Sequence, residues 1–266
     1  MAPTLPRSLS PSKVSSFTDC PLAFRLAYID GLPQQPSAAA VKGTLVHAAL
    51  EALIWDNPAG QRTEEAAAAA LERAWRELQD DPEFVALELG EADAQLFGDD
   101  AQVLVDNYFK LEDPDSVRAV GVELGVETDL AHLRLRGIID RLDVTDEGEL
   151  VVVDYKTGRA PGPQHERGRL TGVHLYALLC EQMLGRRPAE VRLLYLRTPT
   201  EIVAVPTAQT VEGQRRRTAA VWQAIERSFD RQDFRPKASA LCDYCSFQAY
   251  CPLYGGTPPG SDPGPA

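Results

Sequence analysis

Two short apolar runs in the middle of the chain are separated by a polar turn. The runs cover Leu135–Val144 and Leu150–Val153, and Thr145-Asp146-Glu147-Gly148 lies between them. Apolar runs of strand length on either side of a glycine-containing turn are typical of a β-hairpin. The pattern therefore predicts two antiparallel strands, and three consecutive valines, Val151 to Val153, predict that the second strand is buried on both faces.

The rest of the chain alternates between helical and strand periodicity. Apolar residues at helical spacing predict helices over Ala38–Trp55, Thr63–Leu78, Glu83–Phe109, Leu170–Leu184 and Thr210–Arg231. Shorter segments predict further strands over Val117–Leu130, Glu190–Leu196 and Glu201–Pro206. This order of elements predicts an α/β fold with a mixed central sheet flanked by helices.

Each strand of the predicted hairpin ends near a carboxylate. Asp140 follows Gly137-Ile138-Ile139, and Asp154 follows the valine run with Lys156 two residues later. Side chains alternate along a strand, so Asp154 and Lys156 share a face and Tyr155 points away. Two carboxylates on adjacent strands repel each other unless a divalent cation lies between them, and Mg²⁺ or Mn²⁺ suits such oxygen ligands. A lysine beside the metal can orient or deprotonate a water and stabilise a developing phosphorane charge.

A surface ion pair between Asp154 and Lys156 is the simpler interpretation of the same residues. Two features favour the metal site. Asp154 emerges from a strand that is predicted to be buried, and Asp140 follows an apolar triplet. Charges at the ends of buried strands are seldom left unpaired, so both carboxylates are expected to bind something.

Charge is unevenly distributed along the 266 residues. The net charge is −12, yet residues 56–115 hold 17 acidic and 4 basic residues, so the remainder carries a net charge of +1. The acidity therefore belongs to one helical segment, and the rest of the chain does not repel phosphate. We interpret this acidic helical segment, residues 56–115, as a lid or wall; solvated helix faces are the simpler explanation.

Three of the five cysteines lie close together near the C-terminus. Cys242, Cys245 and Cys251 follow a C-x₂-C-x₅-C pattern, and a closed thiolate site needs a fourth ligand, for which Cys20 and Cys180 remain. The N-terminus lacks a signal-peptide pattern and no apolar run reaches membrane-spanning length, so we expect a cytoplasmic protein without a membrane partner. In a reducing compartment, metal binding is favoured over disulfides.

Several motifs together resemble the RecB-like branch of the PD-(D/E)xK nuclease superfamily. Gly137-Ile138-Ile139-Asp140-Arg141 resembles its G-x-x-D-R motif, and Asp154-Tyr155-Lys156-Thr157-Gly158 resembles its D-Y-K-T-G motif. A G-x-x-x-H-x-x-x-E pattern from Gly43 to Glu51 is similar to the motif whose histidine binds the catalytic metal. The resemblance implies that His47, Asp140, Asp154 and the carbonyl of Tyr155 hold Mg²⁺ or Mn²⁺, with Asp140, Asp154 and Lys156 as catalytic residues.

The same resemblance implies a second metal centre. In the RecB-like branch, a cysteine at the position of Cys20 is the first ligand of an iron–sulfur cluster. Cys20, Cys242, Cys245 and Cys251 are thus expected to hold a [4Fe–4S] cluster that joins the two chain ends, with zinc as the alternative. Cys180 is expected to be an inert buried thiol. The implied fold is one restriction-endonuclease-like domain over residues 9–254, with disordered tails at 1–8 and 255–266.

The resemblance also implies an activity and its partners. We expect a metal-dependent DNA nuclease, an exonuclease acting on DNA ends or single strands in repair or recombination. The chain has no G-x-x-x-x-G-K-[ST] motif, so unwinding would require a helicase in trans. The alternatives are a non-catalytic iron–sulfur module that binds DNA or assembles with a helicase, and a zinc-stabilised enzyme of unrelated chemistry.

Two positions qualify the match to the family pattern. A glutamate often lies on the strand before G-x-x-D-R, which makes Glu123 a further metal-site candidate, with Glu127 as the other choice. The family's glutamine four residues before a tyrosine is absent, since Gly172 stands four residues before Tyr176. Gln164 or His174 would have to replace that glutamine.

Overall fold

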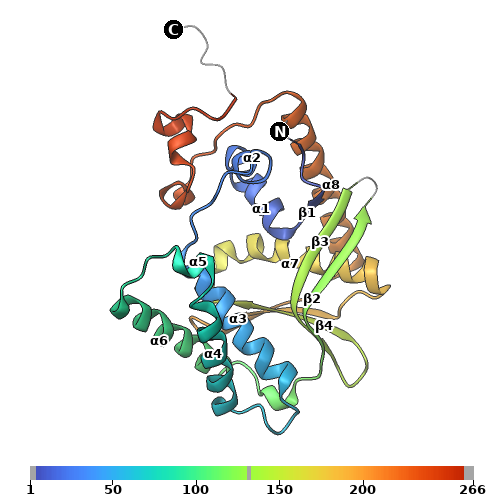
Figure 1. Ribbon diagram of the computed structural model, residues 1–266. Helices are drawn as coiled ribbons and strands as arrows, with labels where there is room; N and C mark the ends of the chain where they lie inside the picture. Colours follow the sequence, from blue (N-terminus) through green and yellow to red (C-terminus); the bar gives the residue numbers. More distant parts are fainter. Residues whose placement is uncertain (1–3, 131–132, 261–266) are drawn as a thin grey trace. The chain divides into compact units, whose positions relative to one another are not determined.

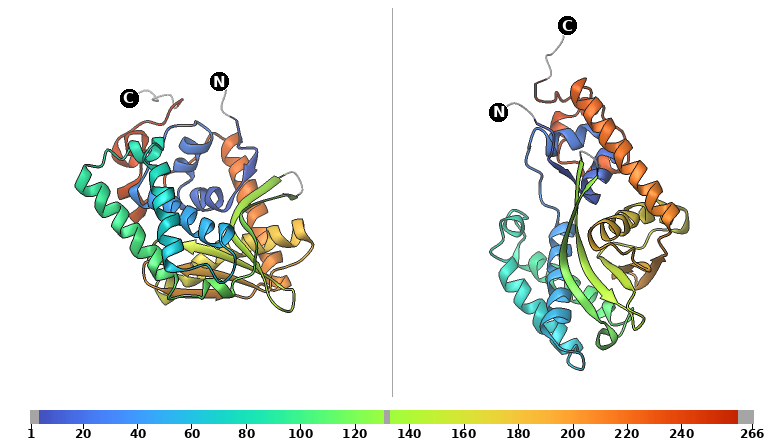
Figure 2. Two further views of the ribbon diagram at one scale, coloured as in Figure 1. Left: turned by 60° about the horizontal axis from the view of Figure 1, so that its bottom comes forward. Right: turned by 90° about the vertical axis from the view of Figure 1, so that its right-hand side faces the viewer.

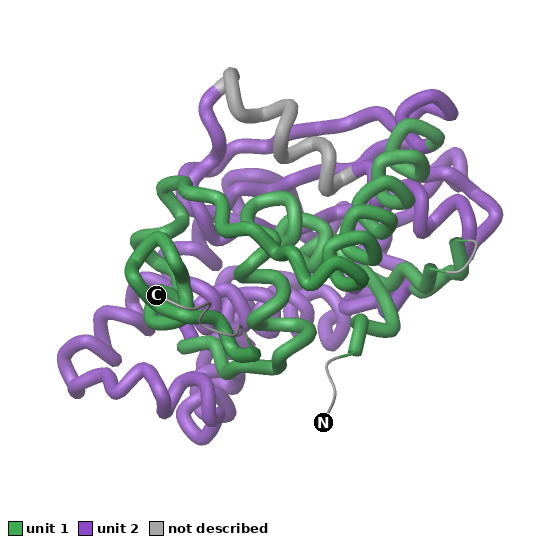
Figure 3. The backbone as a smooth tube through the Cα atoms, turned by 90° about the horizontal axis from the view of Figure 1, so that it is seen from above, with its two compact units in different colours: residues 1–35, 127–137, 212–266 green, residues 36–126, 138–211 purple. Residues whose placement is uncertain are grey.

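The computed structural model describes residues 4–130 and 133–260, and describes residues 163–173 only as backbone. The chain separates into two compact units, which Figure 3 shows in different colours. Unit 1 comprises residues 1–35, 127–137 and 212–266, and unit 2 comprises residues 36–126 and 138–211. Unit 1 is thus assembled from both ends of the chain and a short internal piece. The boundaries 9–254 for one domain stay a prediction.

The strands form a mixed sheet of the predicted kind. They are β1 (Ser8–Leu9), β2 (Ala119–Leu130), β3 (Leu133–Val144), β4 (Leu150–Lys156), β5 (Glu190–Tyr195) and β6 (Thr200–Ala204). The order is β1-β3-β4-β5-β6, with β2 also paired to β3. The pairs β1–β3 and β4–β5 are parallel, whereas β3–β4 and β5–β6 are antiparallel. The family's mixed sheet is therefore present.

The predicted hairpin is confirmed. Strands β3 and β4 pair in a register that runs from Val144 opposite Leu150 to Arg141 opposite Val153. Gly148 lies in the turn with a φ of 77°, a left-handed conformation that glycine adopts without strain. The residues from Val151 to Tyr155 are all buried, which confirms the prediction made for the three valines. Asp154 therefore lies on a strand that the core covers from both sides.

Helices flank the sheet in unit 2. They are α3 (Ala38–Asp56), α4 (Glu64–Leu78), α5 (Pro82–Val85), α6 (Glu91–Tyr108) and α7 (Pro163–Leu184), with the 3₁₀ turn η1 (Pro114–Ser116). Figure 2 shows α3 to α6 on one side of the strands and α7 on the other. Leu50, Leu71, Leu104 and Val153 lie in one buried cluster, so the first group packs on the valine strand.

One predicted helix is wrong in extent. The segment Glu83–Phe109 was expected to form a single helix, but α5 ends at Val85 and α6 begins at Glu91. Glu88 between them has a φ of 51°, which an α-helix does not allow. Trp75, Phe84 and Phe97 pack together across this break. The gain from this aromatic packing explains why the chain turns here.

Helix α3 is apolar enough to resemble a membrane segment. Its 19 residues have a hydropathy of 1.2, so by length and composition it meets the criterion for a span, contrary to the expectation from sequence. Seven of its residues, among them Leu45, Leu50 and Ile54, lie in the core of unit 2. A core helix of a soluble protein has the same composition, so this is weak evidence for a membrane partner.

Unit 1 holds the N-terminal helices and the C-terminal cysteines. Helices α1 (Pro11–Asp19) and α2 (Pro21–Tyr28) belong to this unit, together with the start of β3 and most of α8 (Ala208–Asp230). Figure 1 labels all four elements. The C-terminal part forms three short 3₁₀ turns, η2 (Ala240–Tyr244), η3 (Gln248–Tyr250) and η4 (Pro252–Tyr254). Of the tails that were expected to be disordered, residues 1–3 and 261–266 lie outside the described residues.

Candidate active site and cysteine cavity

Strand pairing brings the two predicted carboxylates together. The ladder between β3 and β4 ends at the pair Arg141–Val153. Asp140 and Asp154 are the next residues on the two strands. The backbone N–H of Tyr155 donates a hydrogen bond of 2.7 Å to Asp140 Oδ2. Asp140 is therefore held directly against the strand that carries Asp154.

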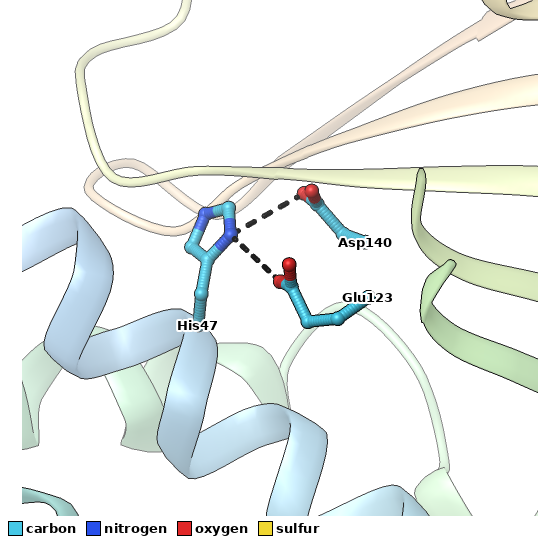
Figure 4. Close-up of side chains that lie close together, drawn as sticks. All are labelled: His47, Glu123 and Asp140. Carbon is cyan, nitrogen blue, oxygen red and sulfur yellow. Dashed lines mark ion pairs between the residues drawn. The ribbon is translucent and has the colours of Figure 1, made fainter. Parts of the chain in front are cut away.

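Helix α3 supplies the histidine. Ser37 caps the helix by accepting a hydrogen bond from the N–H of Ala40. His47 lies ten residues after this cap. The Nε2 atom of His47 is 3.1 Å from the carbonyl oxygen of Tyr155. Its Nδ1 atom is 3.5 Å from Asp140 Oδ2, as Figure 4 shows. The structure thus places His47 beside two of its predicted partners.

A strained residue of β2 completes this cluster. Glu123 Oε1 lies 3.9 Å from His47 Nδ1 (Figure 4), and ligand atoms of His47, Glu123 and Asp140 all lie within 4.8 Å of one another. Glu123 has a φ of 43°, a left-handed conformation that is rare inside a strand. Glu127, the other choice from sequence, instead pairs with Arg134 at 3.3 Å. The geometry therefore favours Glu123.

Asp154 and Lys156 share a strand face, as predicted. Lys156 Nζ lies 2.5 Å from Asp154 Oδ2, and the Asp154 side chain is only 6 % exposed. Among the residues whose side chains are described, the ion pair with Lys156 is the one polar contact of this Oδ2 atom, which has no hydrogen-bond partner of suitable geometry. A buried carboxylate oxygen with so little compensation is suited to a cation.

The pKa values of the residues in this cluster are shifted from their ordinary values. Burial and the nearby charge of Asp154 raise the pKa of Asp140 to about 6. Burial lowers the pKa of His47, but a hydrogen bond with Glu123 and the charges of Asp140 and Asp154 outweigh burial and leave it raised. Burial lowers the pKa of Lys156 as well, and the charge of Asp154 more than restores it. Lys156 is thus a cation at neutral pH.

The donor set fits a divalent metal ion. It contains two carboxylates of adjacent strands, an imidazole and a backbone carbonyl, the mixture of oxygen and nitrogen ligands that Mg²⁺ and Mn²⁺ accept. His47, Glu123 and Asp140 bring three such ligand atoms within 4.8 Å of one another, which makes them a possible metal site. Asp154 and the Tyr155 carbonyl as further ligands stay predictions.

A cavity of about 480 Å³ opens beside the histidine. Its walls include Gly43, Thr44, Glu51 and Glu123. Burial raises the pKa of Tyr176 on α7, and the charges of Asp154 and Asp140 raise it further. The side chain of Gln164 lies outside the described residues, so its replacement of the family's glutamine stays a prediction.

The four predicted cluster ligands meet in unit 1. Cys20, Cys242, Cys245 and Cys251 are free thiols that line one cavity of about 240 Å³. Three of them also pack against the buried Leu22, Leu26 and Phe247, and the N–H of Ser239 lies 3.4 Å from Cys242 Sγ. Cys180 is fully buried on α7, and burial raises its thiol pKa to about 12, which agrees with an inert thiol. Four thiols around one cavity are the ligand type that a thiolate-bound metal centre needs.

The arginines of the C-terminal half, which could contact nucleic-acid phosphates, differ in their surroundings. Arg215 and Arg216 on α8 each pair with Glu212, at 3.3 and 3.0 Å. Arg159 lies in the exposed loop after β4. Arg167 and Arg169 have side chains outside the described residues. None of these side chains is brought to the carboxylate cluster by a contact in the described part of the chain.

Sequence reasoning missed the residues behind the site. The guanidinium of Arg141 is buried and contacts Tyr108, Glu112, Asp143 and the hydroxyl of Tyr155. Arg141 was recognised only as part of the G-x-x-D-R motif. Tyr108 and Glu112 lie about thirty residues earlier in the acidic helical segment, where no local pattern distinguished them from helix surface.

Comparison with known proteins places this geometry in a family. Residues 8–252 match the family described as the PD-(D/E)XK nuclease superfamily. The Gene 69 protein of Mycobacterium phage D29 is 25 % identical over 270 residues, covering 92 % of this chain and 96 % of that protein. The Gene 69 protein of Mycobacterium phage L5 is 29 % identical over 136 residues, covering 50 % and 44 %.

A solved structure agrees at the level of the fold. It is a protein from Eubacterium rectale described as a candidate exonuclease, with a TM-score of 0.54 and 12 % identity over 90 % of this chain and 87 % of that one. A family match over nearly the whole chain, a mixed sheet flanked by helices and a converging acidic cluster lead to one assignment. The chain belongs to the PD-(D/E)XK nuclease superfamily.

Proposed function

We propose that this protein is a metal-dependent deoxyribonuclease that removes nucleotides from DNA ends or single strands. The observation that carries the proposal is the position of His47 in unit 2, 3.5 Å from Asp140 and 3.1 Å from the Tyr155 carbonyl. Asp154 and Lys156 flank Tyr155 on the same strand and form an ion pair. His47, Asp140, Asp154 and the Tyr155 carbonyl would hold Mg²⁺ or Mn²⁺, and Glu123 lies next to this set. A bound metal of this kind acts as a Lewis acid on a phosphoryl oxygen and lowers the pKa of bound water.

The chain's own groups supply the remaining steps. The charged Lys156 orients the attacking water and stabilises negative charge as it builds on the phosphoryl oxygens. Asp154 holds the lysine in place through their ion pair of 2.5 Å. Asp140 is fixed by the Tyr155 N–H, so its other oxygen is left to bind. The cavity beside His47 gives access to this cluster.

The activity is tested on labelled DNA. Wild-type protein with Mn²⁺ should shorten end-labelled linear single strands and should leave circular single strands intact. Labels on the 5′ and the 3′ end in separate reactions then give the polarity. Cleavage of the circle would show an endonuclease instead. Absence of cleavage with either metal, while the protein still binds DNA, would favour the alternative of a non-catalytic module that partners a helicase.

We further propose that the cysteine cavity holds a [4Fe–4S] cluster in this DNA repair or recombination enzyme. The proposal is supported by four cysteines that line one cavity and by the resemblance of the chain to RecB-like nucleases. Zinc accepts the same four thiolates and is the alternative that metal analysis tests. About four irons per chain in anaerobically purified protein is the expected result.

A further inference from the structure

A single arginine is buried behind the carboxylate cluster. The side chain of Arg141 is 1 % exposed, yet all three of its nitrogens donate hydrogen bonds. A guanidinium presents its donors in a rigid planar fork, so partners on several sides fix both its position and its plane. Burial of this charge is tolerable only because these partners are present.

The partners of Arg141 come from three elements of unit 2. Glu112, just after α6, accepts from Nη1 at 2.5 Å and from Nη2 at 3.0 Å. Asp143 on β3 accepts from Nε at 2.9 Å. The hydroxyls of Tyr108 on α6 and Tyr155 on β4 accept from Nη1 at 3.1 and 2.7 Å. The acidic helical segment therefore reaches the back of the site through Tyr108 and Glu112.

Tyr155 connects this network to the metal site. Its hydroxyl contacts Arg141, its N–H binds Asp140, and its carbonyl faces His47. Arg141 itself follows Asp140 along β3. Fixing the side chain of Tyr155 thus limits rotation of the peptide groups on both sides of that residue.

We propose that Arg141 is a positioning residue that orients the Tyr155 peptide for metal binding through the Tyr155 hydroxyl. Tyr108 and Glu112 hold the guanidinium in the plane that this contact needs. The acidic helical segment is then a back wall of the site and not a lid. The inference rests on the proposed metal-dependent activity and adds residues to it. Outer partners of this kind change metal affinity or activity by about 10- to 100-fold when they are removed.

Two tyrosines offer a matched pair of variants. Tyr155→Phe and Tyr108→Phe each remove one buried hydroxyl from Arg141 Nη1, and both residues are almost fully buried. Only Tyr155 carries a ligand carbonyl. Both variants should lower the melting temperature by a similar amount. Mn²⁺ affinity, measured by electron paramagnetic resonance titration, should fall about tenfold in Tyr155→Phe and less than threefold in Tyr108→Phe.

Two further variants separate positioning from general destabilisation. Glu112→Gln, which reaches the site only through Arg141, should weaken Mn²⁺ binding at temperatures where the variant is fully folded. The double variant Arg141→Lys with Tyr155→Phe should bind Mn²⁺ no more weakly than Arg141→Lys alone. Both changes break the same contact, that between Arg141 and the Tyr155 hydroxyl.

Failure of the positioning role can be distinguished from failure of the proposed nuclease activity. Equal Mn²⁺ affinity in Tyr155→Phe and Tyr108→Phe would overturn the positioning role of Arg141. Additive losses in the double variant would do the same. Wild-type protein that neither binds Mn²⁺ nor cleaves DNA would overturn the proposed function itself, and the positioning role with it.

Discussion

The carboxylate cluster and the cysteine cavity are built in opposite ways. The first lies at the end of a buried strand, and its side chains are fixed by backbone N–H, imidazole and lysine contacts. The second lies among short 3₁₀ turns, and Phe247 is the only buried residue between 240 and 254. Tyr244, next to two of the cysteines, is 89 % exposed. A site built on a core keeps its geometry without its ligand, whereas turns with so little core depend on what they bind.

Removal of a cysteine from the proposed cluster should give the largest loss of stability. Cys245→Ser is expected to lose iron and to destabilise the protein by about 4–5 kcal/mol, if the cluster joining Cys20 to the C-terminal cysteines acts as a cross-link over a loop of more than 100 residues. Iron analysis and thermal melting of anaerobically purified protein measure this. Cys180→Ser is the matched control and should keep full iron content. Stoichiometric zinc in colourless wild-type protein would contradict the cluster.

Removal of a carboxylate from the proposed metal site should affect cleavage much more than stability. Asp154→Asn is expected to reduce cleavage by about 10³-fold or more, because a metal that is lost or displaced no longer stabilises the transition state. Its stability should change little, because the relief of repulsion with Asp140 is offset by the loss of the ion pair with Lys156. Asp146→Asn, in the exposed turn of the same hairpin, is the control. Full cleavage by Asp154→Asn would refute the assignment of the active site.

A smaller change, in Mn²⁺ affinity, should appear when protons compete with the metal ion. The pKa of Asp140 is about 6 in the folded chain against an ordinary value of 3.8. Because the folded pKa is the higher one, the stability contributed by this proton is complete below about pH 4 and is lost as the pH rises through 6. Mn²⁺ must displace the proton, so affinity should fall up to about tenfold per pH unit below pH 6.

Titration of Mn²⁺ between pH 5 and pH 8 checks this expectation, and melting curves at both ends give the stability side. Mn²⁺ should raise the melting temperature more at pH 7.5 than at pH 5.5. An affinity that does not change over this range would mean that Asp140 is not a ligand. The cysteine cavity has no carboxylate among its four expected ligands, so iron content should stay constant over the same interval.

Local pattern was sufficient for some parts of this structure and insufficient for others. The hairpin was predictable because alternation, a valine run and a glycine turn all act within twenty residues. The break at Glu88 was not, because its cause is aromatic packing between α4, α5 and α6. His47 required a family motif, since a single histidine on a helix has no distinctive pattern. The partners of Arg141 lie on three elements, and nothing local to any of them indicates the contact.

The way in which unit 1 is assembled has a consequence for the order of synthesis. All of unit 2 precedes residue 212, whereas unit 1 needs residues up to 251 to bring its last cysteine to Cys20. On the ribosome the chain emerges from its N-terminus, and compact parts fold as they become complete. The residues of the carboxylate cluster are therefore all made before Cys242, Cys245 and Cys251 emerge to join Cys20. If the proposed cluster is present, its insertion must follow synthesis of residue 251, and a cell short of iron would accumulate chains that lack it.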